Sequence, residues 1–91
     1  MNVTESSGNV FTDLGFETAE AAILQMRADL ISDLREYIQS AKMTAQASRR
    51  LGIPQSRISD LMRGKWEKFS LEMLITLESR VGRKVRVELA A

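Results

Sequence analysis

Between positions 55 and 63 the chain carries several side chains that donate or accept hydrogen bonds, spaced so that most share one side of a short helix. They are Gln55, Ser56, Arg57, Ser59 and Arg63. Glutamine can make two hydrogen bonds to adenine, and arginine two to guanine, along the edge of a base pair in the major groove. We therefore predict that these five residues read base edges, with Gln55 and Arg57 nearest the start of the helix and closest to the bases.

The sequence lacks most of the residue types and motifs that catalysis uses. The 91 residues include no cysteine and no histidine, which excludes disulfides, thiolate zinc sites and imidazole catalysis. There is also no phosphate-binding glycine loop and no metal-spaced cluster of carboxylates. We expect a protein that is not an enzyme and that binds no cofactor or metal.

Length and composition indicate one small folded domain. The chain is 44% hydrophobic and 27% charged, which is ordinary for a globular protein. No stretch approaches the roughly 20 apolar residues of a membrane span, and the N-terminus lacks the basic start and apolar run of a signal peptide. We expect a cytoplasmic protein with no contact to a membrane.

Charge is divided unevenly along the chain. Residues 1–41 hold two basic and seven acidic residues, whereas residues 42–91 hold eleven basic and five acidic residues. The densest basic block, at residues 42–68, favours a surface that faces a polyanion. The alternative is an ordinary solvated surface of mixed charge, with Arg49 and Arg50 as solvated helix residues.

A long helix and a tail precede the basic block. Residues 1–9 are polar and predict a flexible N-terminal tail, whereas residues 10–91 predict a single domain. Thr18 is the expected N-cap of a helix that runs to about Ser40. Its buried face is predicted from apolar residues at intervals of three or four, namely Ala19, Ile23, Met26, Leu30, Leu34 and Ile38.

Two short helices follow, joined by a tight turn. The first is predicted to run through Leu51, with Thr44 as its N-cap and Gly52 ending it, and the second over residues 55–62, ended by Gly64. Pro54 favours an extended residue before it and so places the turn between them. Two short helices in this arrangement form a helix-turn-helix, at about residues 44–63.

The last third of the chain predicts one more helix and a strand. Ser70 is the expected N-cap of a helix over residues 71–80 that ends at Gly82. Alternation of apolar and charged residues predicts a half-buried strand at about residues 84–89. Since one strand cannot stand alone, we expect it to pair with residues 9–13 or with another subunit. The fold class is mainly α, a compact bundle of about four to five helices plus a short C-terminal β-strand.

The helix-turn-helix segment also resembles a known family. Residues 43–64, with Leu-Gly-Ile-Pro-Gln-Ser-Arg-Ile-Ser-Asp-Leu at their centre, closely resemble the XRE (Cro/repressor-like) regulators. Segments 9–16, 64–71 and 81–87 look like a subgroup that contains HigA-like antitoxins. The resemblance implies a lambda-repressor-like fold.

The family resemblance also implies which residues contact the phosphates of the DNA backbone. Counting back from Gly52 places Thr44 where the family has a phosphate-contacting glutamine, since the first motif helix here is one residue shorter. Lys65 and Lys68 follow the second motif helix, where the family's loop runs beside DNA. The expected phosphate contacts are thus Thr44, Arg49, Arg50, Lys65 and Lys68, while Asp60 is expected to pair within its own helix because phosphate would repel it.

The function expected from these features is a sequence-specific DNA-binding repressor that acts as a homodimer on a palindromic operator in double-stranded DNA. By resemblance it is the antitoxin of a type II toxin–antitoxin pair that autoregulates its operon, with a RelE/HigB-like toxin as partner. Two alternatives remain open: a stand-alone phage-type or chromosomal XRE regulator, and a protein-interaction module that kept the fold and lost DNA binding.

Overall fold

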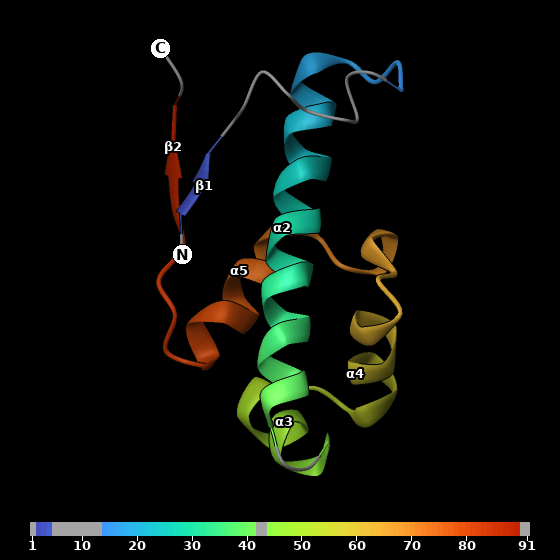
Figure 1. Ribbon diagram of the computed structural model, residues 1–91, viewed down its shortest axis with the longest axis vertical. Coiled ribbons are helices and arrows are strands. Elements are labelled where there is room, and N and C mark those ends of the chain that lie inside the picture. The colour runs from blue at the N-terminus through green and yellow to red at the C-terminus, as the bar shows by residue number, and fades with distance from the viewer. Residues whose placement is uncertain (1, 5–13, 42–43, 90–91) are drawn as a thin grey trace.

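The computed structural model describes residues 2–4, 14–41 and 44–89 of the chain. Within these ranges the fold is mainly helical, and its α-helices are α2 (Thr18–Ser40), α3 (Thr44–Leu51), α4 (Gln55–Met62) and α5 (Leu71–Arg80) (Figure 1). The shorter elements are the 3-10 turn η1 (Trp66–Lys68) and the strands β1 (Asn2–Thr4) and β2 (Arg86–Glu88). The predicted helical bundle with a short C-terminal strand is confirmed. None of the described helices has the length and apolar character required to span a membrane.

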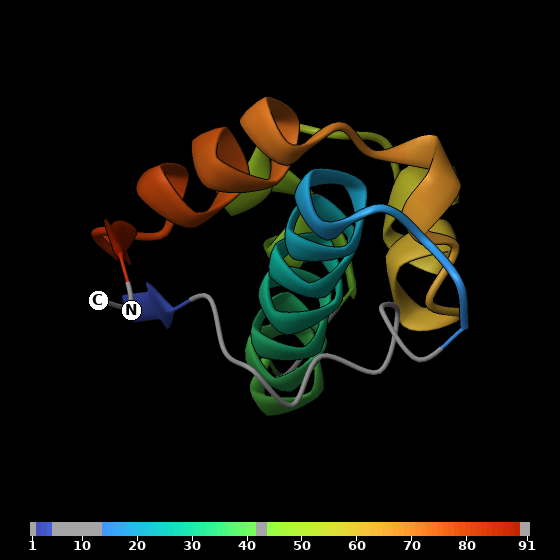
Figure 2. The same ribbon diagram turned by 90° about the horizontal axis from the view of Figure 1, so that it is seen from above.

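Helix α2 runs through the centre of the molecule, with α5 packed on one side and α4 on the other (Figures 1 and 2). Its predicted boundary at Ser40 is confirmed, and its buried face over the second half is also as predicted. In the first turns the prediction is wrong, because Ala19 is exposed and Ile23 is 42% exposed, whereas Ala21 and Leu24 are buried. These turns rise above the level of α4 and α5, so those helices do not cover them (Figure 1).

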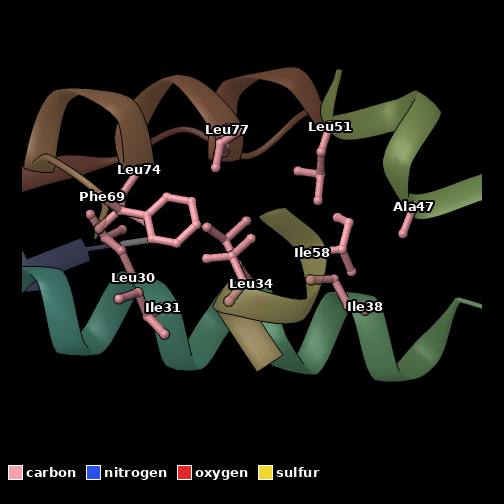
Figure 3. Packing of buried hydrophobic residues seen from close by; sticks show 11 residues of the cluster. Leu30, Ile31, Leu34, Ile38, Ala47, Leu51, Ile58, Phe69, Leu74 and Leu77 are labelled. Atoms are coloured by element: carbon pink, nitrogen blue, oxygen red, sulfur yellow. The ribbon is translucent and has the colours of Figure 1, made fainter. Parts of the chain in front are cut away.

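The core forms where the four helices meet. Leu30 and Leu34 of α2 face Leu74 and Leu77 of α5, and the ring of Phe69 lies between the two helices (Figure 3). Phe69 is 1% exposed, so the residue that precedes α5 is part of the core. Burying each of these side chains stabilises the fold by about 1.5–3 kcal/mol before entropy is counted. The helix-turn-helix is joined to the same core by Ala47, Leu51, Ile58 and Leu61.

Helix starts follow the predicted signals in one case and not in another. The Ser70 hydroxyl accepts a 3.1 Å hydrogen bond from the Met73 amide, which confirms the predicted cap of α5. The prediction for α2 is wrong by one residue, since Glu17 is the N-cap and makes no side-chain capping bond. Thr18 instead occupies the first helical position, where its hydroxyl is not in place to cap. Thr44, the expected N-cap of α3, is likewise its first helical residue, so that prediction is also wrong by one residue.

The C-terminal strand differs from its prediction in length, partner and exposure. It covers Arg86–Glu88 instead of residues 84–89, and it pairs in parallel with β1, with Val3 opposite Val87. The expected partner, residues 9–13 or a second subunit, is therefore replaced by a strand within the predicted tail; residues 5–13 lie outside the described residues. Val87 is 49% and Leu89 86% exposed, so the strand is not half-buried as expected.

Candidate nucleic-acid interface

Helices α3 and α4 are held together by a closely bonded turn. The amides of Gly52 and Ile53 both donate to the carbonyl of Ser48, at 2.8 and 3.2 Å, and the Ser48 hydroxyl donates back to the Ile53 carbonyl. Gly52 has φ +71°, a left-handed conformation that glycine adopts without strain. Ala47 is fully buried where α3 packs on α4. The predicted helix-turn-helix thus has the geometry that fixes one helix relative to the other.

One side of α4 carries polar side chains that the core leaves exposed. Gln55, Ser59 and Arg63 follow one another at intervals of four residues, and Ser56 lies beside them on the same side. All four are exposed, and no ion pair of the described residues involves Arg63. The inner side holds Ile58 and Leu61, both buried. Four of the five predicted base-reading residues are thus brought together on one free surface.

Arg57 is placed differently. Its side chain is half-buried, its Nη2 donates a 3.0 Å hydrogen bond to the Lys68 carbonyl, and its guanidinium lies 4.4 Å from the centre of the Phe69 ring. Both contacts are with the segment after α4. Arg57 therefore ties the helix to that segment and lies apart from the side formed by Gln55 and Arg63.

Asp60 also links α4 to the segment that follows it. Its Oδ1 lies 3.9 Å from Lys65 Nζ and 3.7 Å from Lys68 Nζ. The expectation of a partner within the helix is therefore wrong: Asp60 pairs with the two lysines of the loop, because η1 folds back along α4. Both lysine side chains remain partly exposed, at 35% and 46%, so they can still reach an anion outside the protein.

Helix α3 adds two exposed cations. Arg49 and Arg50 lie in its last turn, and no hydrogen bond or ion pair within the described residues involves either side chain. Arg50 and Gln46 line a polar hollow beside Tyr37 of α2. The side chain of Thr44, the remaining predicted phosphate contact, lies outside the described residues.

The start of α4 offers backbone donors as well. Its N-cap is Pro54, whose side chain makes no capping hydrogen bond. The Pro54 carbonyl accepts from the amides of Arg57 and Ile58, at 3.0 and 3.2 Å. The amides of the first helical turn in front of these have no partner within the helix, and such groups attract anions.

A buried acidic cluster lies away from this surface and joins α2 to α5. Glu78 is fully buried, and the nearest cation is Arg83, whose Nη1 lies 3.9 Å from Glu78 Oε1. Arg83 is also bonded to Asp33 of α2. Burial, together with the nearby Asp33 carboxylate, raises the pKa of Glu78 to about 8. Among the described residues neither Glu78 oxygen accepts a hydrogen bond, so the protonated form is the one that fits this site.

Four supporting contacts around α4 were not predicted: those of Arg57 with Lys68 and Phe69, and those of Asp60 with Lys65 and Lys68. The Phe69 ring lies under the Arg57 guanidinium. Asp60 was not expected to hold Lys65 and Lys68. The sequence pattern carries no signal for the contact of Arg57 with Phe69, because their distance depends on how η1 folds.

Comparison with known families supports the same identification of the motif. A family model described as "Helix-turn-helix domain" matches residues 10–90, which is most of the chain. Comparison with curated proteins finds no match.

Proposed function

Because the chain belongs to the family of helix-turn-helix domains, we propose that it is a sequence-specific DNA-binding repressor in which α4 lies in the major groove. A helix-turn-helix domain is typical of DNA-binding regulators and generally not of enzymes. The observation that carries the proposal is the exposed side of α4. Gln55, Ser56, Ser59 and Arg63 are free there, while the opposite side of the helix is anchored in the core.

Base reading is assigned to this side of α4. Gln55 stands at the first helical position, where docking of this motif brings side chains closest to base edges. Arg63, at the other end, is the arginine available for guanine. Arg57, predicted from the sequence as a second base reader, is better suited to holding η1 against α4, because both its contacts go to Lys68 and Phe69.

Phosphate contacts are assigned to the surroundings of α4. Lys65 and Lys68 follow it, Arg49 and Arg50 are exposed on α3, and Thr44 begins α3. Asp60 holds the ammonium groups of Lys65 and Lys68 beside α4 and offsets part of their charge. The unbonded amides at the start of α4 add donors that carry no sequence information but fix the position of the helix.

We propose a homodimer on a palindromic operator as the working form. One recognition helix buries too little surface for the affinity of a regulator, which is about 10⁻⁸ M or tighter. Two copies related by a two-fold axis would place their helices in successive major grooves about 34 Å apart.

The antitoxin role is the more detailed part of the proposal. Resemblance of segments 9–16, 64–71 and 81–87 to HigA-like antitoxins supports it, with a RelE/HigB-like toxin as the partner and the chain's own operon as the target. The acidic composition of the N-terminal part, against the basic block at residues 42–68, would keep α2 free for a basic protein while α4 binds DNA.

The experiment that tests the function is a titration of DNA upstream of the chain's own gene, followed by fluorescence anisotropy, beside random DNA of equal length. Sequence-specific binding that weakens in Gln55→Ala, while the exposed α2 control Gln39→Ala behaves like the parent, supports the proposal. Binding that is equally weak on both DNAs, for the parent protein, contradicts it and favours a protein-interaction module instead.

A further inference from the structure

A second surface lies at the N-terminal end of α2. The first turns of α2 and Trp66 of η1 line an apolar hollow of about 450 Å³. We call it the α2–η1 groove and define it by Phe16, Glu17, Glu20, Ile23, Arg27 and Trp66. Its large apolar side chains stay partly open to solvent: Phe16 and Trp66 are each 37% exposed and Ile23 is 42% exposed. Leu14, just before the groove, is 69% exposed. Apolar residues gathered in this way mark an interaction site more often than a chance surface.

The charges at the groove indicate the sign of its occupant. Glu17 and Glu20 both line it and are exposed, and the ion pairs formed by the described residues include neither of them. Arg27 is the single cation among the lining residues, and its Nε is buried with no hydrogen-bond acceptor among the described residues. An occupant that suits the groove therefore has an apolar part with positive charges beside it.

We propose that the α2–η1 groove docks a partner protein through an aliphatic or aromatic side chain flanked by lysine or arginine. A peptide segment supplies both features through neighbouring side chains. Small ligands are normally enclosed over 70–90% of their surface, which a groove with such exposed walls does not achieve. Nucleic acid and anionic membranes are disfavoured, because Glu17 and Glu20 repel phosphate.

Docking in this groove also reaches the DNA-binding surface. Trp66 belongs to η1, and the flanking Lys65 and Lys68 pair with Asp60 of α4. A partner that packs on Trp66 thus touches the segment that holds both lysines. We expect partner binding to change DNA affinity; this step rests on the proposed function, whereas docking itself does not.

Trp66 provides the readout, because it is the single tryptophan of the chain. The full chain is titrated with two synthetic 12-residue peptides that share a Leu-Phe centre, one flanked by lysines and one by glutamates. Trp66 emission and the anisotropy of labelled peptide are followed together. We expect saturable one-to-one binding of the lysine peptide with a shift of Trp66 emission to shorter wavelength, and at least tenfold weaker binding of the glutamate peptide.

Matched variants locate the site. Ile23→Asp places a charge on the groove wall and should abolish the shift, and Glu17→Lys combined with Glu20→Lys should weaken binding of the lysine peptide at least tenfold. Ser32→Asp, at an exposed position elsewhere on α2, should bind like the parent. Circular dichroism confirms that each variant is folded, and the charge-reversed pair tests the site without changing its apolar wall.

Several results would overturn the proposal. These are no saturable binding of the lysine peptide up to millimolar concentration, equal affinity for both peptides, or equal behaviour of Ile23→Asp and Ser32→Asp. A shift of Trp66 emission that follows protein concentration without peptide would mean that a second copy fills the groove. If operator DNA is not bound while the lysine peptide is, the proposed function fails and the groove stands; DNA binding without peptide binding gives the reverse.

Discussion

Arg80 and Leu51, the last residues of α5 and α3, are joined by a hydrogen bond. The Arg80 Nη1 donates to the Leu51 carbonyl at 2.8 Å. The next residue, Gly52, has φ +71°, and a Cβ added there would lie 3.1 Å from the same nitrogen. The Arg80 side chain of α5 therefore caps the C-terminal end of α3 and fills the space beside the turn at Gly52.

Replacing Arg80 by alanine should destabilise the fold, because the carbonyl at the end of α3 loses a charged donor. We expect a loss of about 1–2 kcal/mol in the free energy of unfolding. Urea titration measures it, with Arg83→Ala as a variant that loses a different bond.

Gly52→Ala should lower the free energy of unfolding by a similar amount, because alanine is strained in this backbone conformation. The loss should be smaller in the Arg80→Ala background, where the close contact with the arginine is gone. Fully additive costs would show that the arginine does not crowd the turn.

Gln55→Ala should separate specific from nonspecific DNA binding. A bidentate contact to adenine is worth about 1–3 kcal/mol of discrimination, so affinity for the operator should fall by roughly tenfold to a hundredfold. Affinity for random DNA should change little, because Gln55 carries no charge. Anisotropy titrations on both DNAs measure the two values. Equal losses would mean that Gln55 reads no base.

Lys65→Ala should change the salt dependence of DNA binding. Removing one phosphate contact lowers the slope of log K against log salt by roughly 0.9, and the same is expected for Arg50→Ala. Asp60→Asn makes the opposite change at the same place, since it frees Lys65 and Lys68 of their partner, and should strengthen nonspecific binding. An unchanged slope in Lys65→Ala, in a variant that melts like the parent, would assign this lysine to the solvated surface.

The sequence predicted those features of the fold and site that depend on residues close together in the chain, and failed where distant residues meet. The turn at Gly52, the end of α3, the boundaries of α4 and the cap at Ser70 depend on a few neighbouring residues, and all were predicted correctly. The pairing of β2 with β1 joins opposite ends of the chain and depends on three residue pairs, for which the sequence pattern carries no signal. The same holds for Arg57, because its position is decided by the ring of Phe69, which η1 brings back to α4.

The pKa of Glu78 predicts how stability changes with pH. In the folded chain it is raised to about 8 from an ordinary value of 4.5, so between these limits the folded state holds about one proton more than the unfolded state. Stability should therefore fall as pH rises from 4.5 to 8, by about 2–4 kcal/mol. The chain has no histidine, so few other side chains titrate in this window.

Glu78→Gln supplies the matched test, since the amide resembles the protonated acid. It should remove most of this slope and make the protein more stable than the parent at pH 8, with little difference near pH 5. Glu72→Gln, at an exposed position of the same helix, should keep the parent's slope. Urea titrations at several pH values give both results, and an unchanged slope in Glu78→Gln would mean that Glu78 is ionised in the folded chain.

The last prediction concerns the proposed homodimer. On β2 and just after it, Val87 is 49% and Leu89 is 86% exposed, and the strand pairs with β1. We expect these side chains, together with the outer side of α5, to be covered by a second copy. Val87→Lys combined with Leu89→Lys places two charges in that contact, so the dimer should dissociate to monomers at tens of micromolar, as measured by light scattering.

DNA binding should follow the change in assembly. A palindromic operator gains from two linked recognition helices, and a monomer loses that linkage, so operator affinity should fall at least a hundredfold. Ser32→Lys combined with Gln39→Lys adds the same charge at exposed positions of α2 and should leave the mass at that of a dimer. This control is needed because added lysines by themselves strengthen nonspecific binding to DNA. A parent protein that is monomeric at these concentrations and binds the palindrome as a single copy would contradict the dimer, whatever the two variants do.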